Sequence, residues 1–442
     1  MALTFRGGVI FSEGKNTRKI PIENFPAPGL VRIPMLQHIG APAEPVVQAG
    51  DIVDKGQLIG QINADTLSCP VHSSVSGKVT EIENGWAERI IKIENDYADR
   101  LCADIRPFDK KINETGAGEI INIIRQAGIS GLGGAGFPTY AKIQSAMGKV
   151  GALIINGAES EPYITANHRL MLEQPELIIN GAKILLKALG LKKCVIVIED
   201  NKLNAADSIT RVLKKSKLIE IKILKTKYPQ GDERQLIYAL TGKETAPDKA
   251  PVDRGYIIFN VETVAAICRA FTEGAPLIDR IITVDGDCIM SPKNLRVPIG
   301  TPVFELIAYC GLKQEPDIII QGGGMTGIPV LDKDAPVIKG TTAVLVFSGG
   351  KLSERRKRSD FICIRCGRCA ESCPMRLQPL YFAMFARNGN IRDCEDYDVM
   401  SCTECGCCQY ICPAGVPVVE HIRTVKRRIN ERADFEHEHE HE

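Results

Sequence analysis

The middle of the chain alternates between a helical pattern and short apolar runs. Between residues 119 and 128, apolar side chains recur at the spacing of one helix face. These positions are Ile120, Ile123, Ile124 and Ala127. Apolar runs of strand length follow at 151–157, 192–200 and 219–225, with a second helical stretch at 175–190. Strands that are apolar on both faces are typical of a parallel sheet covered by helices, so residues 111–275 predict an α/β domain.

Both flanks of this region predict short strands instead. Residues 1–110 contain brief apolar stretches separated by turn residues, among them Gly50, Gly56, Gly60 and Gly77. This pattern resembles a biotinyl/lipoyl-type sandwich. Carriers of that type need a lysine at a hairpin tip, and residues 61–77 contain none, so we expect a structural or docking module. Residues 276–350 return to short strands.

Size and charge exclude several classes of protein. The chain has 442 residues, too many for one core, and its net charge of +1 suggests neither nucleic acid nor an anionic membrane as a partner. We expect domains at 1–110, 111–275, 276–350 and 351–432, with a basic linker at 351–360 and a tail or tag at 433–442. No apolar run approaches the roughly 20 residues of a membrane span. The N-terminus lacks a signal-peptide pattern, so we expect a cytoplasmic protein that docks on a membrane complex.

Two nearly identical runs, CIRCGRCAESCP from Cys363 and CTECGCCQYICP from Cys402, contain nine of the 16 cysteines, and eight of these nine recur at the same spacing in both runs. Thiolates suit iron–sulfur clusters and zinc. Zinc sites usually offer separate CxxC pairs, whereas this spacing is that of bacterial ferredoxins, in which the fourth cysteine of each run binds the other cluster. We therefore predict two [4Fe–4S] clusters. The first uses Cys363, Cys366, Cys369 and Cys412; the second uses Cys402, Cys405, Cys408 and Cys373.

The remaining cysteines have simpler interpretations. Cys407 lies inside the second run and Cys394 before it, but neither fits the shared spacing, and we interpret them as bystanders. Scattered cysteines such as Cys69 and Cys194 are interpreted as small buried hydrophobes in a reducing compartment.

A glycine-rich loop at 128–142 formally matches GxGxxG at Gly131, Gly133 and Gly136. The dinucleotide fingerprint requires a strand before the loop, and here a helix precedes it, so the usual interpretation fails. Glycines still let backbone N–H groups approach a phosphate or a ring closely, and Lys142 could supply a counter-charge. A plain flexible loop is the alternative.

Three further stretches put acidic and amide side chains after predicted strands, where ligands bind in open α/β sheets. They are NGAESEPYITANHR at 156–169, YPQGDERQLIYALTG at 228–242 and YIIFNVETVA at 256–265. Each alone could be a solvated loop. Their recurrence at strand ends favours a ligand site.

Together these four stretches resemble the NADH- and FMN-binding flavoprotein subunit of respiratory complex I. The domain order is closer still to the C-subunit family of Rnf complexes. That resemblance covers essentially the whole chain apart from the tail. It implies a biotinyl/lipoyl-like N-terminal sandwich, an α/β flavin domain, an SLBB β-grasp segment and a C-terminal ferredoxin-like α domain with two [4Fe–4S] clusters.

The resemblance also implies roles for individual residues. The flavin pocket would use Gly131, Gly133, Gly134, Gly136, Lys142, Asn156, Glu159, Ser160, Gly231 and Asn260. The nicotinamide nucleotide would contact Phe137, Glu161, Glu233 and Lys249. The chain departs from the family pattern at Leu132, Ala158 and Phe259.

The expected function is that of an electron-transfer subunit of a membrane-bound, ion-translocating ferredoxin:NAD⁺ oxidoreductase. NAD(H) exchanges a hydride, each cluster carries single electrons, and a flavin handles both, which explains the combination. No catalytic acid–base pair is needed. The implied partners are the other subunits of the complex, with ferredoxin acting indirectly. Two alternatives remain: an NADH-dependent corrinoid reductase of the microcompartment type, and a non-catalytic iron–sulfur adaptor.

Overall fold

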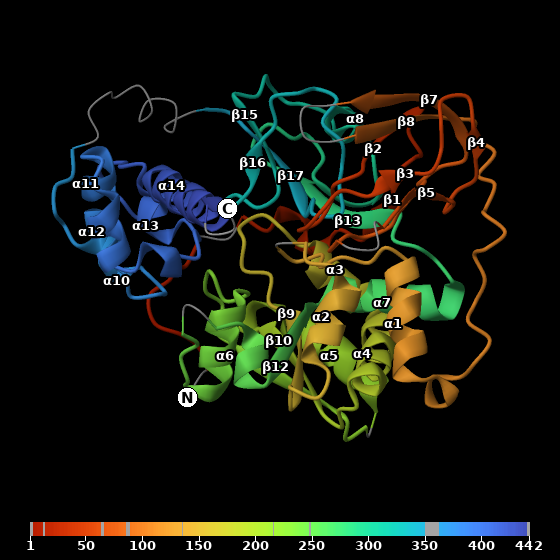
Figure 1. Ribbon diagram of the computed structural model, residues 1–442, viewed down its shortest axis with the longest axis horizontal. Helices are drawn as coiled ribbons and strands as arrows, with labels where there is room; N and C mark the ends of the chain where they lie inside the picture. The colour runs from red at the N-terminus through yellow and green to blue at the C-terminus, as the bar shows by residue number, and fades with distance from the viewer. Residues whose placement is uncertain are drawn as a thin grey trace.

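The computed structural model describes residues 3–11, 14–62, 66–84, 89–134, 136–214, 216–246, 249–349 and 362–439, with side chains as far as residue 432. The predicted basic linker at 351–360 lies outside the described residues, as does the end of the predicted tail. Figure 1 shows four parts: a β module at the upper right, a helix-covered sheet below, a mixed sheet at the top and a helical body at the left.

The β module is a sandwich of short antiparallel strands. Its larger sheet has the order β2-β8-β7-β4, and its smaller sheet has the order β3-β5-β6. The strands are β2 (Leu30–Pro34), β3 (Glu44–Pro45), β4 (Ile52–Val53), β5 (Leu58–Gln61), β6 (Val71–His72), β7 (Gly77–Asn84) and β8 (Arg89–Asn95). Their apolar side chains, including Val31, Ile59 and Ile91, form a buried core of their own.

The α/β domain is built on a four-stranded parallel sheet, as the apolar runs predicted. Its strands are β9 (Ala152–Gly157), β10 (Cys194–Glu199), β11 (Ile219–Leu224) and β12 (Tyr256–Asn260). Its helices are α1 (Ala117–Gln126), α2 (Thr139–Ala146), α3 (Ala166–Glu173), α4 (Pro175–Leu189), α5 (Leu203–Leu213), α6 (Glu233–Thr241) and α7 (Val261–Glu273).

Helices cover both faces of this sheet, because its strand residues are apolar on both sides. On one face, Leu153 and Ile155 pack with residues of α1, α4, α5 and α7. On the other face, Ile154 packs with Leu236 and Ile237 of α6. The predicted helix face of α1 is confirmed in Ile120 and Ile124, which are fully buried.

A six-stranded mixed sheet follows, in the order β1-β14-β13-β17-β15-β16. Its strands are β1 (Ile22–Asn24), β13 (Asp279–Asp285), β14 (Lys293–Pro298), β15 (Ile318–Gln321), β16 (Ile328–Pro329) and β17 (Ala343–Phe347), and α8 (Val303–Cys310) packs on it. β1 comes from the N-terminal region and pairs in parallel with β14, so residues Ile22–Asn24 lie outside the sandwich. This pairing covers backbone groups that an edge strand would otherwise expose.

The helical body contains both cysteine runs. It comprises α10 (Arg368–Glu371), α11 (Pro379–Arg387), α12 (Ile391–Asp396), α13 (Cys407–Tyr410) and α14 (Val418–His439). Phe382, Val419 and Ile422 form its core beside the cysteines.

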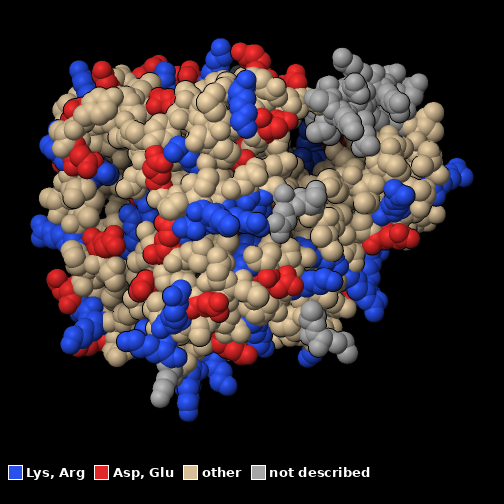
Figure 2. Space-filling view, turned by 180° about the vertical axis from the view of Figure 1, so that it is seen from behind, with Lys and Arg blue, Asp and Glu red and all other residues tan. Residues whose placement is uncertain are grey.

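Positive and negative side chains are interspersed over the molecular face shown in Figure 2. That distribution agrees with a net charge of +1. Within the part of the chain that the structure describes, no helix combines the length and the hydrophobicity that crossing a bilayer requires.

Candidate functional site

The α/β sheet reverses its direction of growth between β9 and β12. From β9 the chain adds β10 and then β11 on one side, and it returns to place β12 on the other side of β9. The carboxyl ends of two such strands flank the crevice where open α/β sheets bind ligands. Asn156 of β9 and Asn260 of β12 are register partners at this edge. The sheet therefore brings two predicted flavin residues side by side, although 104 positions of sequence separate 156 from 260.

The glycine loop closes on itself above this edge. Ser130 and Pro138 form an isolated bridge, and the N–H of Gly131 donates to the carbonyl oxygen of Phe137 at 2.9 Å. Gly133 packs on Asn260 so tightly that a β-carbon would lie 2.7 Å from Asn260 Nδ2. At Gly134 a β-carbon would meet no atom within 4 Å. Gly133 and Gly134 are both exposed, so their backbone is available to a ligand.

Leu132, where the family pattern has an arginine, turns inward. Its side chain is buried in the domain core. Its N–H donates to Thr263 Oγ1 at 2.9 Å, and its carbonyl oxygen accepts from Arg280 Nη2 at 3.0 Å. The backbone of the loop is thus fixed by α7 and β13, and the departure at this position leaves the glycines in place.

Asn156 connects the crevice to the loop before α6. Its Nδ2 donates to the carbonyl oxygen of Gly231 at 2.9 Å, and its Oδ1 accepts from Ala158 N at 3.0 Å. A β-carbon at Gly231 would lie 3.0 Å from the carbonyl oxygen of Ala158, so the two loops pack closely. On the neighbouring strand, Asn260 Oδ1 accepts from Glu262 N at 2.8 Å and caps α7.

A cation lies at the mouth of this crevice. Lys142 Nζ forms an ion pair with Glu233 Oε1 at 2.6 Å and lies 5.4 Å from the centre of the Phe259 ring. Asp232 caps α6 by accepting from Arg234 N and Gln235 N, and burial raises the pKa of its carboxyl group. Phe137 and Lys249 are exposed and lie near these loops in the sequence.

The predicted residues Glu159 and Glu161 turn away from the glycines. Glu159 is buried and caps α3, accepting from Asn167 N at 2.8 Å and His168 N at 3.3 Å. Glu161 accepts from Met325 N at 3.0 Å and from Thr326 Oγ1 at 2.8 Å, and burial raises its pKa. Ser160 lies half-buried between them.

Lys15 fixes the backbone of this acidic loop. Its Nζ donates to the carbonyl oxygens of Glu159, Glu161 and Ile164 at 2.7, 2.9 and 2.7 Å. Burial, together with the charge of Lys202, lowers the pKa of Lys15 to about 8. The acidic loop is therefore tied to the N-terminal region and to the mixed sheet.

The remaining members converge on one cradle. The exposed glycine backbone packs on Asn260, the register partner of Asn156, and Lys142 Nζ lies 5.4 Å from the ring of the adjacent Phe259. Backbone N–H groups and a cation suit a phosphate, and amides suit the polar edge of a ring. This donor set fits FMN.

The two cysteine runs adopt the same backbone conformation. Arg365 and Glu404, each two residues after the first cysteine of its run, both have φ of 54°. In each case the N–H donates to the preceding cysteine sulfur at 3.3 Å, from Arg365 to Cys363 and from Glu404 to Cys402. Such N–H···S bonds are among the means by which proteins tune iron–sulfur clusters.

Cysteines of both runs meet in the helical body. A single cavity is lined by Cys402, Cys405 and Cys408 of the second run and by Cys373 of the first. Cys363, Cys369 and Cys412 all pack, partly buried, against the hydrophobic core of the helical body. Among the described residues, no group of three or more His, Cys, Asp or Glu side chains is close enough to hold a single metal ion.

The two cysteine sets have different surroundings. Cys373 and Cys408 are buried, whereas Cys366 is exposed together with most of the loop around it. Gly406 packs against the carbonyl oxygen of Met325, where a β-carbon would lie at 3.2 Å. The second set therefore faces the rest of the protein, and the first set faces outward.

Tyr228 connects the second cysteine set with the flavin loops, a contact that sequence reasoning missed. Its hydroxyl donates to the carbonyl oxygen of Cys405 at 2.7 Å, and it precedes Gly231 by three residues. Cys407, interpreted as a bystander, is buried with its sulfur 4.0 Å from the Tyr228 carbonyl oxygen. Cys394 is buried too, 3.9 Å from the carbonyl oxygen of Phe382.

The N-terminal segment, residues 3–11, lies between the same two parts (Figure 1). Val9 exchanges both backbone hydrogen bonds with Tyr228, at 2.9 and 2.8 Å. Gly8 N donates to Ser372 O at 2.8 Å, next to Cys373. Gly7, with φ of 66°, packs on Cys373, where a β-carbon would lie 2.5 Å from the carbonyl oxygen. No sequence signal marks this segment, because its contacts are all long-range.

The sandwich packs on the glycine loop. Ile39 N donates to Gly136 O at 3.3 Å. The buried Lys339 Nζ joins the two parts by donating to the carbonyl oxygens of Pro70 and Gly128, at 2.8 and 2.7 Å. Desolvation and the charge of Lys339 lower the pKa of His38 to about 4 and that of His72 to about 3.

Four family descriptions match successive parts of the chain. They are the RnfC barrel sandwich hybrid domain at residues 3–95, the Nuo51 FMN-binding domain at 124–269, the SLBB domain at 281–329 and a 4Fe-4S dicluster domain at 361–416. The expected fold class, the FMN cofactor and the two iron–sulfur clusters are thereby confirmed.

Two relatives match this chain over nearly its whole length. The chain is 40% identical over 435 residues to the C subunit of the proton-translocating ferredoxin:NAD(+) oxidoreductase complex of Clostridium ljungdahlii, covering 96% of this chain and 94% of that protein. It is 39% identical to the C subunit of the Na(+)-translocating complex of Acetobacterium woodii, covering 96% and 97%. An NAD+-reducing [NiFe]-hydrogenase structure in the H2-reduced state shares the fold, with a TM-score of 0.50, 18% identity and coverage of 72% of this chain and 63% of that one.

Proposed function

This chain belongs to the C-subunit family of ion-translocating ferredoxin:NAD(+) oxidoreductase complexes. We propose which of its residues bind FMN, the nicotinamide nucleotide and the two iron–sulfur clusters. The protein is an electron-transfer subunit that contains FMN and two [4Fe–4S] clusters. It exchanges hydride with NAD(H) and single electrons with the other subunits, which are its partners, and ferredoxin acts through them.

FMN would be held at the switch point of the α/β sheet. FMN, when bound, accepts the two electrons of a hydride and releases them singly. Gly133 and Gly134 would offer backbone N–H groups, and Asn156 and Asn260 their amides. Lys142, kept in place by Glu233, would balance the negative charge of the phosphate. Gly131, Gly136 and Gly231 would allow the close loop packing on which the cradle depends.

Among the residues proposed for the nicotinamide nucleotide, Phe137 and Lys249 are exposed, and Glu233 is half-buried at the mouth of the crevice. Glu161 does not share that environment, because its carboxylate is bound by Met325 and Thr326. We therefore assign Glu159 and Glu161 to supporting the acidic loop, and we keep Glu233 as the acidic residue near the nucleotide.

The observation that supports the order of the clusters is the contact between Tyr228 and Cys405. It supports an arrangement in which the cluster of Cys373, Cys402, Cys405 and Cys408 lies next to the flavin domain and that of Cys363, Cys366, Cys369 and Cys412 lies farther out. We propose that the first set serves exchange with the partner subunits. Association with the cytoplasmic side of the membrane would then come from those subunits.

Anaerobic titration of the loaded protein with NADH tests this assignment. We expect the flavin absorbance to bleach first and the electron paramagnetic resonance signal of the second cluster to appear before that of the first. Identical reduction of both clusters in a chain without flavin would contradict the assignment. Reduction of cob(II)alamin by the isolated chain with NADH would instead favour the corrinoid reductase.

A further inference from the structure

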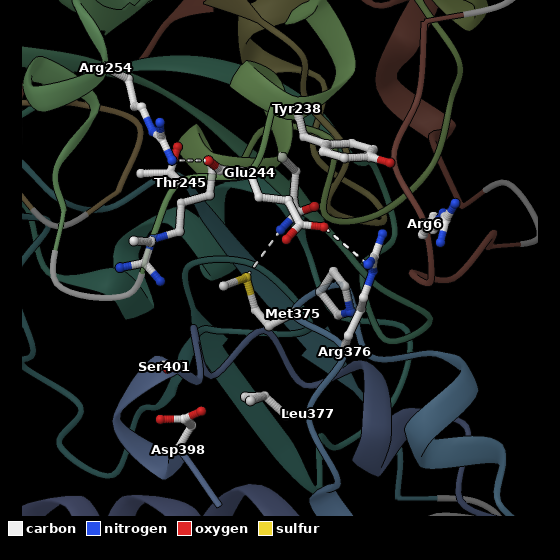
Figure 3. A pocket seen from close by; sticks show the side chains of 14 residues that line it. Arg6, Tyr238, Glu244, Thr245, Arg254, Met375, Arg376, Leu377, Asp398 and Ser401 are labelled. Carbon is white, nitrogen blue, oxygen red and sulfur yellow. Dashed lines mark hydrogen bonds and ion pairs between the residues drawn. The ribbon is translucent and has the colours of Figure 1, made fainter. Parts of the chain in front are cut away.

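A crevice lies between the α/β domain and the second cysteine set, away from the flavin cradle. Its volume is about 360 Å³, within the range of small-molecule sites. In Figure 3, Tyr238, Glu244 and Arg254 line it from one side, and Met375 and Arg376 from the other. None of the residues proposed for FMN or the nicotinamide nucleotide lines it.

The crevice uses a different face of α6 from the flavin cradle. Arg234, Gln235 and Tyr238 line it, whereas Glu233 points to Lys142. At about 100° per residue, Gln235 and Tyr238 lie on the side of the helix opposite Glu233. The helix thus separates two sites.

The lining is cationic. Arg6, Arg234, Arg254 and Arg376 come from four separate segments, and the carboxylates in the lining are Glu244 and Asp398. Four positive charges against two negative ones leave an excess of two positive charges in the lining. Glu244 Oε1 pairs with Arg376 at 3.1 Å, and the Glu244 carbonyl oxygen accepts from Arg254 Nη2 at 2.5 Å. These contacts hold two guanidinium groups at the rim.

The floor of the crevice is neutral and polar. Gln235 is buried, and its Nε2 contacts Met375 Sδ at 3.3 Å. Thr245 is 6% exposed, and its hydroxyl has no hydrogen-bond partner among the described residues. An unpaired buried hydroxyl is costly, so this group favours a ligand or a bound water.

One wall of the crevice is shared with the cavity of the second cysteine set. Pro374, Met375 and Leu377 line both spaces. A charge bound in the crevice would therefore lie one layer of residues from that cluster.

We propose that this crevice binds a nucleoside diphosphate. Guanidinium groups match phosphate oxygens in paired hydrogen bonds, and the excess of two positive charges suits a diphosphate. The ring of Tyr238 offers a face for the base, and the volume accommodates a ligand of this size. A bound anion would make addition of an electron to the neighbouring cluster less favourable, and so would lower its reduction potential.

Isothermal titration of the loaded protein with ADP tests the proposal, with NAD⁺ saturating so that the dinucleotide site is occupied. We expect stoichiometric binding that weakens at least tenfold in the double variant Arg6→Gln/Arg254→Gln. Arg211→Gln removes one positive charge from an exposed position on α5, outside the crevice, and should leave ADP affinity unchanged. Iron and flavin content, measured for every variant, confirm that the fold is retained.

Three results would overturn the proposal: no ADP binding under NAD⁺, complete competition between ADP and NAD⁺, or equal weakening by Arg211→Gln. Inorganic pyrophosphate and Tyr238→Ala test the nucleoside part. If pyrophosphate binds as tightly as ADP and Tyr238→Ala has no effect on ADP, a nucleoside is not recognised. Bleaching of the flavin by NADH in the same samples reports separately on the proposed electron-transfer function.

Discussion

The hydroxyl of Tyr228 donates a hydrogen bond to the carbonyl oxygen of Cys405 across 2.7 Å, joining two residues 177 positions apart. Tyr228 also pairs with Val9 through the backbone, and its ring lies 5.5 Å from that of Phe11. The Phe11 ring in turn contacts Tyr410, with 5.0 Å between ring centres. The N-terminal segment and Tyr228 together hold the second cysteine set against the flavin domain.

Tyr228→Phe should slow electron transfer from the flavin to the second cluster several-fold. The variant keeps the ring but loses one hydrogen bond, worth about 1 kcal/mol, that fixes the Cys405 loop. Stopped-flow absorbance can separate flavin reduction by NADH, which should be unchanged, from cluster reduction. Tyr97→Phe, on the exposed surface of the sandwich, is the control. Unaltered cluster reduction in Tyr228→Phe would show that the contact does not set this rate.

Substitution of the fourth cysteine of each run should remove one cluster in either case, but the two variants should differ in how well NADH reduces the cluster that remains. Cys373→Ser and Cys412→Ser should each lower the iron content from roughly eight to roughly four atoms per chain, because each removes a ligand of one four-iron cluster. NADH should still reduce the remaining cluster in Cys412→Ser and should reduce it poorly in Cys373→Ser, since Cys373 lines the cavity nearer the flavin domain.

Cys394→Ser is the matched control for these variants, because Cys394 is buried outside both cysteine sets. It should retain all the iron. If Cys373→Ser and Cys412→Ser gave the same NADH-reducible signal, the proposed order of the clusters would be wrong.

Gly133→Ala and Gly134→Ala should both lose flavin, for different reasons. At Gly133 the new methyl group would collide with Asn260, so both stability and FMN retention should fall. At Gly134 the methyl group would enter open space, so stability should be unchanged while FMN retention falls. Thermal unfolding and flavin content measure the two effects. Gly118→Ala on α1 also adds a methyl group in open space and should change neither quantity unfavourably.

Glu161→Ala should affect stability more than nucleotide binding. The substitution leaves Met325 N and Thr326 without their acceptor, a loss of about 1 to 3 kcal/mol in the free energy of unfolding. We expect the KM for NADH to stay within about twofold of the wild-type value, a change of less than about 0.5 kcal/mol in binding. Glu233→Gln should instead raise the KM for NADH and leave the free energy of unfolding nearly unchanged. A large rise in the KM for NADH in Glu161→Ala, at an unchanged melting temperature, would show that Glu161 contacts the nucleotide.

Acid should loosen the junction between the sandwich and the glycine loop. His72 has a folded-state pKa of about 3 against an ordinary value of 6.5, because burial and Lys339 disfavour its cation. Between these values the unfolded chain binds more protons, so stability is full above pH 6.5 and falls as the pH drops toward the folded pKa. The slope from His72 alone approaches about 1.4 kcal/mol per pH unit.

Urea unfolding at pH 5 and pH 7 measures this loss. Far-ultraviolet circular dichroism follows the unfolding transition. His72→Gln cannot acquire the charge, so its stability should depend less on pH. His38, with a folded-state pKa of about 4, acts in the same direction and contributes to the slope that remains in His72→Gln. An identical pH dependence in His72→Gln would remove His72 from the explanation.

The sequence by itself determined the features that depend on short-range spacing. Apolar runs predicted the parallel strands β9 and β10, because strands buried on both faces need apolar residues at most positions, and the alternating apolar residues of β11 predicted the edge strand beside them. The cysteine spacing predicted two clusters with exchanged fourth ligands, because the distance along the backbone limits which thiolates can reach one cluster.

Only the tertiary structure decided which of these segments contact one another in the folded protein. Glu161 belongs to a motif beside the flavin residues, yet its carboxylate binds the mixed sheet, since burial requires a partner and Met325 and Thr326 supply it. The residues 3–11 carry no motif, yet they pack between the flavin domain and Cys373. Local spacing sets strands, turns and ligand sets, whereas contacts between distant residues follow from how whole domains pack, and no local pattern encodes them.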